Sequence, residues 1–344
     1  MMVMNHFTRE DIRLIFSIAI VSFVVLPLGS SETNGQQTVG QQIKNTYDQV
    51  TSPRDYQQRQ ATAMAAVAQA PFELTEQETQ YRDQVLDYWE QSSDKIKKYS
   101  CEFRRYEFDT DKVNHRNPKS NQLSAASIGV GELFFAAPQN GRYEVNEIWR
   151  FAAPPKNENE QADYQLQNKE LFREKWIFDG NTIYEFDFSS KRLNETKLPP
   201  EMQGANGLAN SPIPFLFGAK RAEILNRYWV RVVTPKGTQG EYWLEAYPKK
   251  ADDAQNYKKI EIVIAEADFL PKAMHMYGPQ YDPKKGNFAS VQFEFDNRKA
   301  NAIGLQNFFN RPQKPMGWER VQVQPLTSGP DRNAEAILEQ KSNR

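Results

Sequence analysis

From Gly131 to Asn297 the chain consists of strand-length runs, many of which alternate apolar with polar residues. Seven runs, six of which contain aromatic residues, carry the pattern: 131–136, 175–178, 183–188, 228–233, 241–246, 260–264 and 291–295. Alternation with a period of two places successive side chains on opposite faces of a pleated sheet. The pattern predicts a large antiparallel sheet and a fold of the α+β class that is mainly β.

A helix is predicted before the first strand. Thr75 and Glu78 have the spacing of a capping box, in which each side chain bonds the other residue's backbone N–H. Apolar residues then recur at spacings of three, four and seven, as an amphipathic helix of about five turns requires; they are Tyr81, Val85, Tyr88, Trp89, Ile96 and Tyr99. We expect this stripe to lie on the sheet, lysines 95, 97 and 98 to follow at the helix C-terminus, and a strand to span 100–108.

Other segments predict the connections. Asp179-Gly180 between two alternating runs is typical of a hairpin, because glycine accepts a positive φ. Residues 152–174 interrupt the strand pattern and predict an insertion that ends in a short helix. The apolar run 212–218 is too short for a sheet strand and too apolar for an ordinary loop. We interpret it as a cover, followed by a short helix over 219–226.

The ends of the chain have a different composition. Residues 1–31 contain an apolar stretch from Leu14 to Leu28 after two arginines, which indicates a signal peptide or an uncleaved N-terminal anchor. Residues 32–70 form a Gln- and Ala-rich segment that predicts a disordered spacer. We therefore expect export to the periplasm or cell envelope, a folded domain over 71–325 and a polar tail over 326–344.

Charge and candidate chemistry exclude several classes of function. Lys and Arg number 43 against 44 Asp and Glu, so no nucleic-acid partner is indicated. Cys101 is the one cysteine, and neither His115 nor His275 has metal-ligand spacing around it. We expect no metal, no cofactor and no catalytic residues. Acidic residues of 102–111 could supply a carboxylate pair for glycoside hydrolysis, but they more simply form the polar side of one strand.

The aromatic residues remain as the candidate functional feature. Several runs are apolar on both faces; Trp243 and Tyr247, for example, oppose Tyr242 and Leu244. Such a sheet is either covered on both faces or lines a cavity with one of them. For any single one of these aromatic residues, a place in a packed core is the simpler alternative to a place in a cavity wall. The candidate wall or cover residues for ligand binding are Phe134, Trp149, Trp176, Tyr184, Phe215, Phe217, Trp229, Trp243, Met274 and Met276.

The order of these segments resembles the periplasmic lipoprotein carrier superfamily (Lol-type) across residues 72–323. The resemblance is carried by the amphipathic helix, Cys101-Glu-Phe and the segments 131–138, 142–145, 178–186, 212–218, 242–249, 270–272, 308–309 and 315–318. More narrowly, the chain resembles a secreted family of planctomycete-type bacteria built on the same plan.

The resemblance implies a strongly curved antiparallel sheet, a half-barrel covered by helices, that holds acyl chains in an apolar cavity. It places a lid at Pro214–Gly218. The carriers have an arginine before the strand-ending proline that latches the lid, whereas this chain has Ala137. The leading hypothesis is a non-enzymatic binding protein for a lipid or an acylated lipoprotein. An envelope sensor with a membrane-protein partner is the alternative, and an enzyme that uses the cavity is the third.

Overall fold

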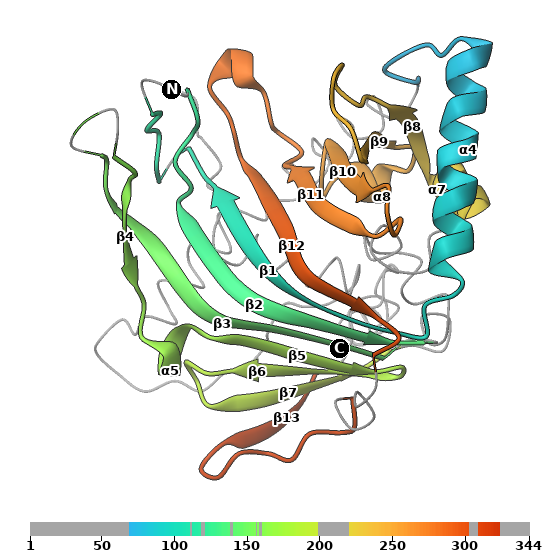
Figure 1. Ribbon diagram of the computed structural model, residues 1–344. Helices are drawn as coiled ribbons and strands as arrows, with labels where there is room; N and C mark the ends of the chain where they lie inside the picture. Colours follow the sequence, from blue (N-terminus) through green and yellow to red (C-terminus); the bar gives the residue numbers. More distant parts are fainter. Residues whose placement is uncertain are drawn as a thin grey trace, which may run out of the picture.

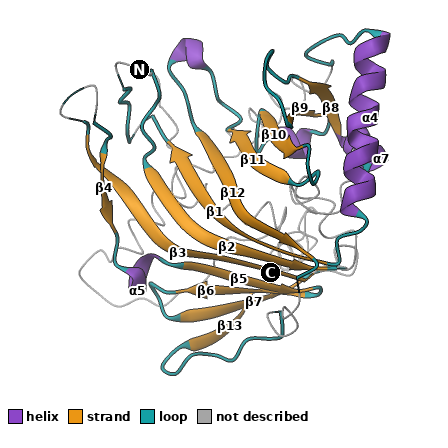
Figure 2. Ribbon diagram, viewed as in Figure 1, coloured by secondary structure: helices purple, strands orange, loops and turns teal. Residues whose placement is uncertain are grey.

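One large sheet dominates the structure (Figures 1 and 2). The computed structural model describes residues 69–110, 112–117, 121–137, 140–155, 157, 160–198, 220–302 and 309–323. Within them lie the helices α4 (Glu76–Ser93), α5 (Lys169–Phe172), α7 (Arg221–Arg227) and α8 (Ala251–Ala254), and the 3-10 turn η3 (Pro283–Lys285). The strands are β1 (Lys98–Phe108), β2 (Ser127–Ala136), β3 (Asn140–Ala153), β4 (Asp163–Leu166), β5 (Glu174–Asp179), β6 (Thr182–Asp187), β7 (Arg192–Lys197), β8 (Tyr228–Val232), β9 (Glu241–Pro248), β10 (Lys259–Ala265), β11 (Pro271–Tyr277), β12 (Ser290–Ala300) and β13 (Glu319–Val323).

In the described part of the chain all 13 strands belong to this sheet, in the order β13-β7-β6-β5-β3-β2-β1-β12-β11-β10-β9-β8, with β4 paired to β3. Neighbouring strands are antiparallel, except that β13 runs parallel to β7. Each of the seven alternating runs falls on a strand, so the prediction of a mainly β fold is confirmed. Strands β4 and β13 were not predicted, because each is only four or five residues long.

Helix α4 begins as the sequence predicts and ends earlier. Thr75 caps it, and both hydrogen bonds of the capping box with Glu78 are present. Its buried apolar residues are Val85, Leu86 and Trp89, whereas the side chains of Tyr81 and Tyr88 are 46% and 56% exposed. The prediction of a continuous aromatic stripe on the sheet was therefore wrong. Because the helix ends at Ser93, the three lysines lie beyond its last turn, and Tyr99 already belongs to β1.

The shorter predictions have mixed outcomes. The hairpin at Asp179-Gly180 is confirmed, with Gly180 at φ +93° between β5 and β6. The short helices α5 and α7 occur where the sequence predicts them. Ala137 is exposed at the end of β2. The leader, nearly all of the spacer, the cover at 212–218 and the C-terminal tail lie outside the described residues.

The two faces of the sheet follow from the strand register, since directly opposed residues point to the same side. The face that packs against α4, here called the covered face, is apolar over many strands. One of its rows crosses six strands from β1 to β8 and consists of Glu107, Val291, Met276, Ile260, Ala246 and Val230. Residues from these strands form one hydrophobic cluster with Val85, Leu86 and Trp89 of α4.

Gly131 permits a close approach between β2 and β3. The register of the two strands shifts between Val130 and Gly131, which marks a bulge. A Cβ atom at Gly131 would lie 1.9 Å from the Glu144 carbonyl oxygen and 2.8 Å from the Phe103 ring. Only glycine fits there without moving the backbone, so this position fixes how β2 and β3 cross the covered face.

We expect Gly131→Ala to lower the free energy of unfolding by at least about 2 kcal/mol, because overpacking a strand crossing displaces the backbone. Chemical denaturation measures the change. Gly141→Ala is the matched control, since a Cβ atom at Gly141 meets nothing within 4 Å. Equal stabilities of the two variants would contradict the close approach at Gly131.

Candidate functional site

Three of the sequence-predicted site residues lie on the covered face. Met274 and Met276 are 3% and 2% exposed and belong to the cluster that packs against α4. Trp176 reaches the same face through a row of opposed residues, Trp176 to Tyr143, Leu133 and Cys101. It is 7% exposed. Cys101 is buried in the same cluster, where a free cysteine behaves as a small apolar residue.

Five other candidates lie on the opposite face of the sheet. In the strand register these residues pair with neighbours that do not belong to the covered face, so their side chains point to the other side of the sheet. They are Phe134, Trp149, Tyr184, Trp229 and Trp243. The structure therefore does not bring the predicted set together in one place. Phe215 and Phe217 lie outside the described residues.

Charged side chains accompany the aromatic residues of the opposite face. The Lys249 ammonium lies 4.0 Å from the centre of the Trp229 ring, a cation–π contact. The Trp243 indole N–H donates a hydrogen bond of 3.0 Å to Glu241. Tryptophans in such contacts form part of a half-buried polar surface. The alternating pattern alone does not reveal this, because it shows which side chains share a face of the sheet but not what covers that face.

Tyr184 differs from the other four because it is 3% exposed. It belongs to a second hydrophobic cluster on β5, β6 and β7, against which Phe188 and Trp318 pack. The Tyr184 hydroxyl donates to Asp179 at 2.8 Å. This cluster lies on the opposite face of β5, β6 and β7, so the sheet has apolar surface on both faces at this end.

A buried ion-pair centre interrupts the apolar covered face. Arg105 Nη1 donates to the Tyr143 hydroxyl and to Glu174 Oε2, both at 2.7 Å, and Nη2 donates to Glu174 Oε1 at 2.9 Å. Arg105 Nη2 also lies 2.7 Å from Glu107 Oε1. The Arg105 side chain is 3% exposed. Burial favours its neutral form, but the charges of Glu107 and Glu174 outweigh burial and raise the pKa of Arg105.

This centre was missed in the sequence. The run 102–111 was interpreted as the polar side of one strand, and this was wrong, because Glu102 and Glu107 point to opposite faces of β1. Glu102 is exposed, whereas the side chain of Glu107 is 12% exposed. The missed signal was the spacing of two charged residues. Arg105 and Glu107 lie two and four residues after Phe103, and therefore on the same face of β1 as Cys101 and Phe103.

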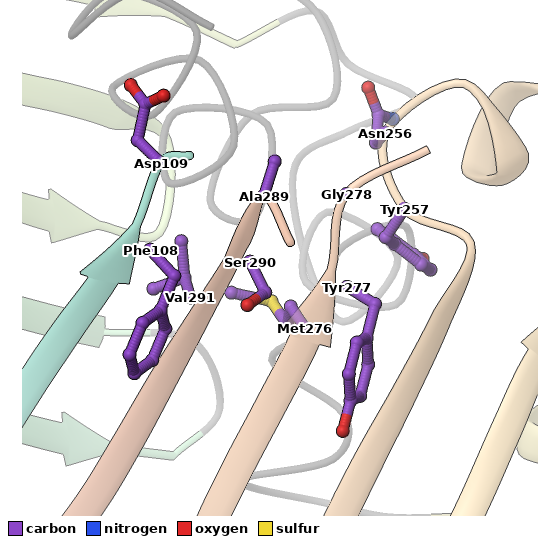
Figure 3. A pocket seen from close by; sticks show the side chains of 10 residues that line it. All are labelled: Phe108, Asp109, Asn256, Tyr257, Met276, Tyr277, Gly278, Ala289, Ser290 and Val291. Atoms are coloured by element: carbon purple, nitrogen blue, oxygen red, sulfur yellow. The ribbon is translucent and has the colours of Figure 1, made fainter. Parts of the chain in front are cut away.

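A small hollow lies at the ends of β1, β11 and β12 (Figure 3). Its lining includes Phe108, Asp109, Tyr257 and Tyr277, together with Met276 and Val291 of the covered face. Val291 is the strand partner of Glu107. The hollow therefore adjoins the apolar row of the covered face.

His275 lies on the opposite face. Its ring stacks on Tyr277 with centroids 4.0 Å apart, and its Nε2 has no hydrogen-bond partner within the described residues. Burial, assisted by the charge of Lys259, lowers the pKa of His275 to about 4. The group is thus neutral in the folded protein at neutral pH.

Within the described residues, no group of three or more His, Cys, Asp or Glu side chains could hold a metal ion. None of the helices described is both long and apolar enough to cross a membrane.

Comparison with known proteins gives only distant structural likeness. No family model matches the sequence, and no curated protein matches it. An uncharacterized conserved protein from Thermus thermophilus is 8% identical, with 70% of this chain and 97% of that one covered and a TM-score of 0.38. A LolA superfamily protein from Nitrosomonas europaea is 11% identical (67% and 97% covered, TM-score 0.29). The Mycobacterium tuberculosis lipoprotein LppX is 8% identical (65% and 98% covered, TM-score 0.31). At these values the likeness is distant and carries no conclusion about ligand or activity.

We expect Arg105→Met to lower the free energy of unfolding by about 3 kcal/mol or more, because it leaves the buried carboxylates of Glu107 and Glu174 without their cation. Arg104→Met is the control, since Arg104 is exposed on the opposite face of the same strand; we expect a loss below about 1 kcal/mol. Urea denaturation compares the two. Equal losses would show that the ion-pair centre does not stabilise the sheet.

The lowered pKa of His275 predicts a pH dependence of stability. Between pH 7 and pH 5 the unfolded chain binds a proton on this histidine and the folded protein does not, so the free energy of unfolding falls as the pH falls, by at most about 2 kcal/mol. Denaturation of the wild type and His275→Gln over this range isolates the effect, because both share every carboxylate. Parallel pH curves would contradict the assignment.

Proposed function

We propose that this protein is an exported, non-enzymatic binding protein that holds a lipid, or the acyl chain of a lipoprotein, against the covered face. One observation carries the proposal. The covered face is apolar and buried from Val230 on β8 to Trp176 on β5, whereas α4 packs on β8 and α7 at one end of the sheet (Figure 1). So wide an apolar face suits an amphiphile, whose chain is stabilised by about 0.8 kcal/mol for each methylene removed from water.

A half-barrel with the covered face on its concave side is part of the proposal. Arg105 of β1 hydrogen-bonds Glu174 of β5 across two intervening strands. In a flat sheet these strands would be about 14 Å apart. Concave curvature brings such side chains together, and Gly129 lies under the guanidinium without a side chain of its own. The contact therefore supports a sheet that curves around its apolar face.

Of the described candidate residues, Trp176, Met274 and Met276 are the proposed wall residues, since all three lie on the covered face. Methionine is suited to this role because its flexible side chain repacks around differently shaped chains. The proposal includes membership of the lipoprotein carrier superfamily, in its planctomycete-type secreted branch. It also places the protein in the cell envelope, on the basis of the apolar stretch from Leu14 to Leu28.

Uptake of a fluorescent fatty acid tests the proposal. We expect the wild type to take up the probe and Met276→Gln, of similar volume but polar, to bind it about tenfold more weakly, because a buried amide without partners disfavours an apolar ligand. Trp243→Gln is the matched control on the opposite face, and we expect its affinity to change less than about twofold. Circular dichroism verifies that both variants are folded. Equal weakening in both, or no uptake by the wild type, would contradict the proposal.

A further inference from the structure

The last described segment of the chain is docked on the far edge of the sheet. Residues 309–323, here called the arm, end in β13, which pairs in parallel with β7. Strand β12 precedes the arm in the chain, yet the six strands β1, β2, β3, β5, β6 and β7 lie between β12 and β13 in the sheet (Figure 1). The arm is therefore held far along the sheet from the strand that it follows.

A buried carboxylate on β7 holds the arm. The side chain of Glu195 is 4% exposed. It accepts hydrogen bonds from Arg320, from Gln322 and from Arg311, the last at 3.1 Å. All three donors belong to the arm, and Gln322 is also the strand partner of Glu195. Without the arm this poorly solvated carboxylate would lose all three donors, which is costly for a buried charge.

An aromatic pocket on the same face receives Trp318. The indole ring packs edge-on against Phe186 and Phe188, with ring centroids 6.0 Å and 5.2 Å apart. The edge of β7, Glu195 and these two phenylalanines are here called the acceptor site. It recognises an extended segment by backbone pairing, by an aromatic side chain and by an arginine two residues further along, Arg320.

The arm is much less buried than the site that receives it. None of the five residues of β13 is buried, whereas Leu193, Glu195 and Thr196 of β7 are. A short strand with little buried surface opens at a lower free energy than the rest of a fold. Opening of the arm would leave the backbone groups of the β7 edge, the carboxylate and the aromatic pocket free to pair with another segment of the same kind.

We propose that the acceptor site also binds the arm of a second copy of this chain, so that two copies exchange arms and form a dimer. The arm is the segment whose fit to the site the structure shows, and a second copy carries the same arm. Reciprocal exchange fills both acceptor sites and closes the dimer with two-fold symmetry. The exchange is independent of lipid binding, because Glu195 is the strand partner of Tyr184 and lies with it on the opposite face.

Two full-length variants with complementary defects test the exchange. The arm-deficient chain, Trp318→Ala with Arg320→Gln, keeps its acceptor site, and the acceptor-deficient chain, Glu195→Gln, keeps its arm. In their mixture the intact arm and the intact site belong to different chains. We expect native mass spectrometry to show a dimer of one chain of each kind, at least about tenfold more abundant than dimers of either variant alone, because Trp and Arg contacts dominate such interfaces.

A third chain that carries both defects is the control, and we expect it to form no dimer with the arm-deficient chain. A mixture of the first two variants that stays monomeric would overturn the exchange. Equal dimer formation by the control chain, or by the arm-deficient chain with itself, would also overturn it, because apolar surface and not the arm would then join the chains. If circular dichroism shows Glu195→Gln to be unfolded, Phe188→Ala replaces it, since Phe188 forms one wall of the pocket.

Discussion

The constraint on which this structure depends is the removal of one wide apolar sheet face from water. The covered face extends over strands from β8 to β5, and the 18-residue helix α4 contributes only Val85, Leu86 and Trp89 as apolar residues to its burial. A sheet face of this kind has to be covered by helices, by curvature of the sheet or by a ligand. The proposed half-barrel combines all three, and the proposed lipid binding is derived from the same requirement.

The ion-pair centre of Arg105 is the exception within this apolar face. Buried charges cost more desolvation energy than most of their contacts return, unless they are paired and fully hydrogen-bonded. Here the paired groups come from β1 and β5, with Tyr143 of β3 as a further partner. The centre therefore ties three strands together.

The sequence predicted the class of fold well, but not how the candidate residues divide between the two faces of the sheet. Local sequence patterns identified most of the strands, the Thr75 cap and the Asp179-Gly180 turn, because these are local properties of the chain. They could not place Trp176 and Trp243 on opposite faces, since that depends on register across several strands and on the bulge at Gly131. The role of Arg105 was missed for the same reason. From the sequence alone, a charged strand residue such as Arg105 is expected to lie in solvent. Only the pairing of the strands shows that Glu174 of β5 lies beside it.

The most direct test of the central claim is native mass spectrometry, followed by lipid extraction, of the protein purified from its own cell envelope. The account predicts additional mass from bound amphiphile, which organic extraction removes and which reappears on exposure to envelope lipid. A protein that carries no lipid on purification and acquires none on exposure would contradict the account.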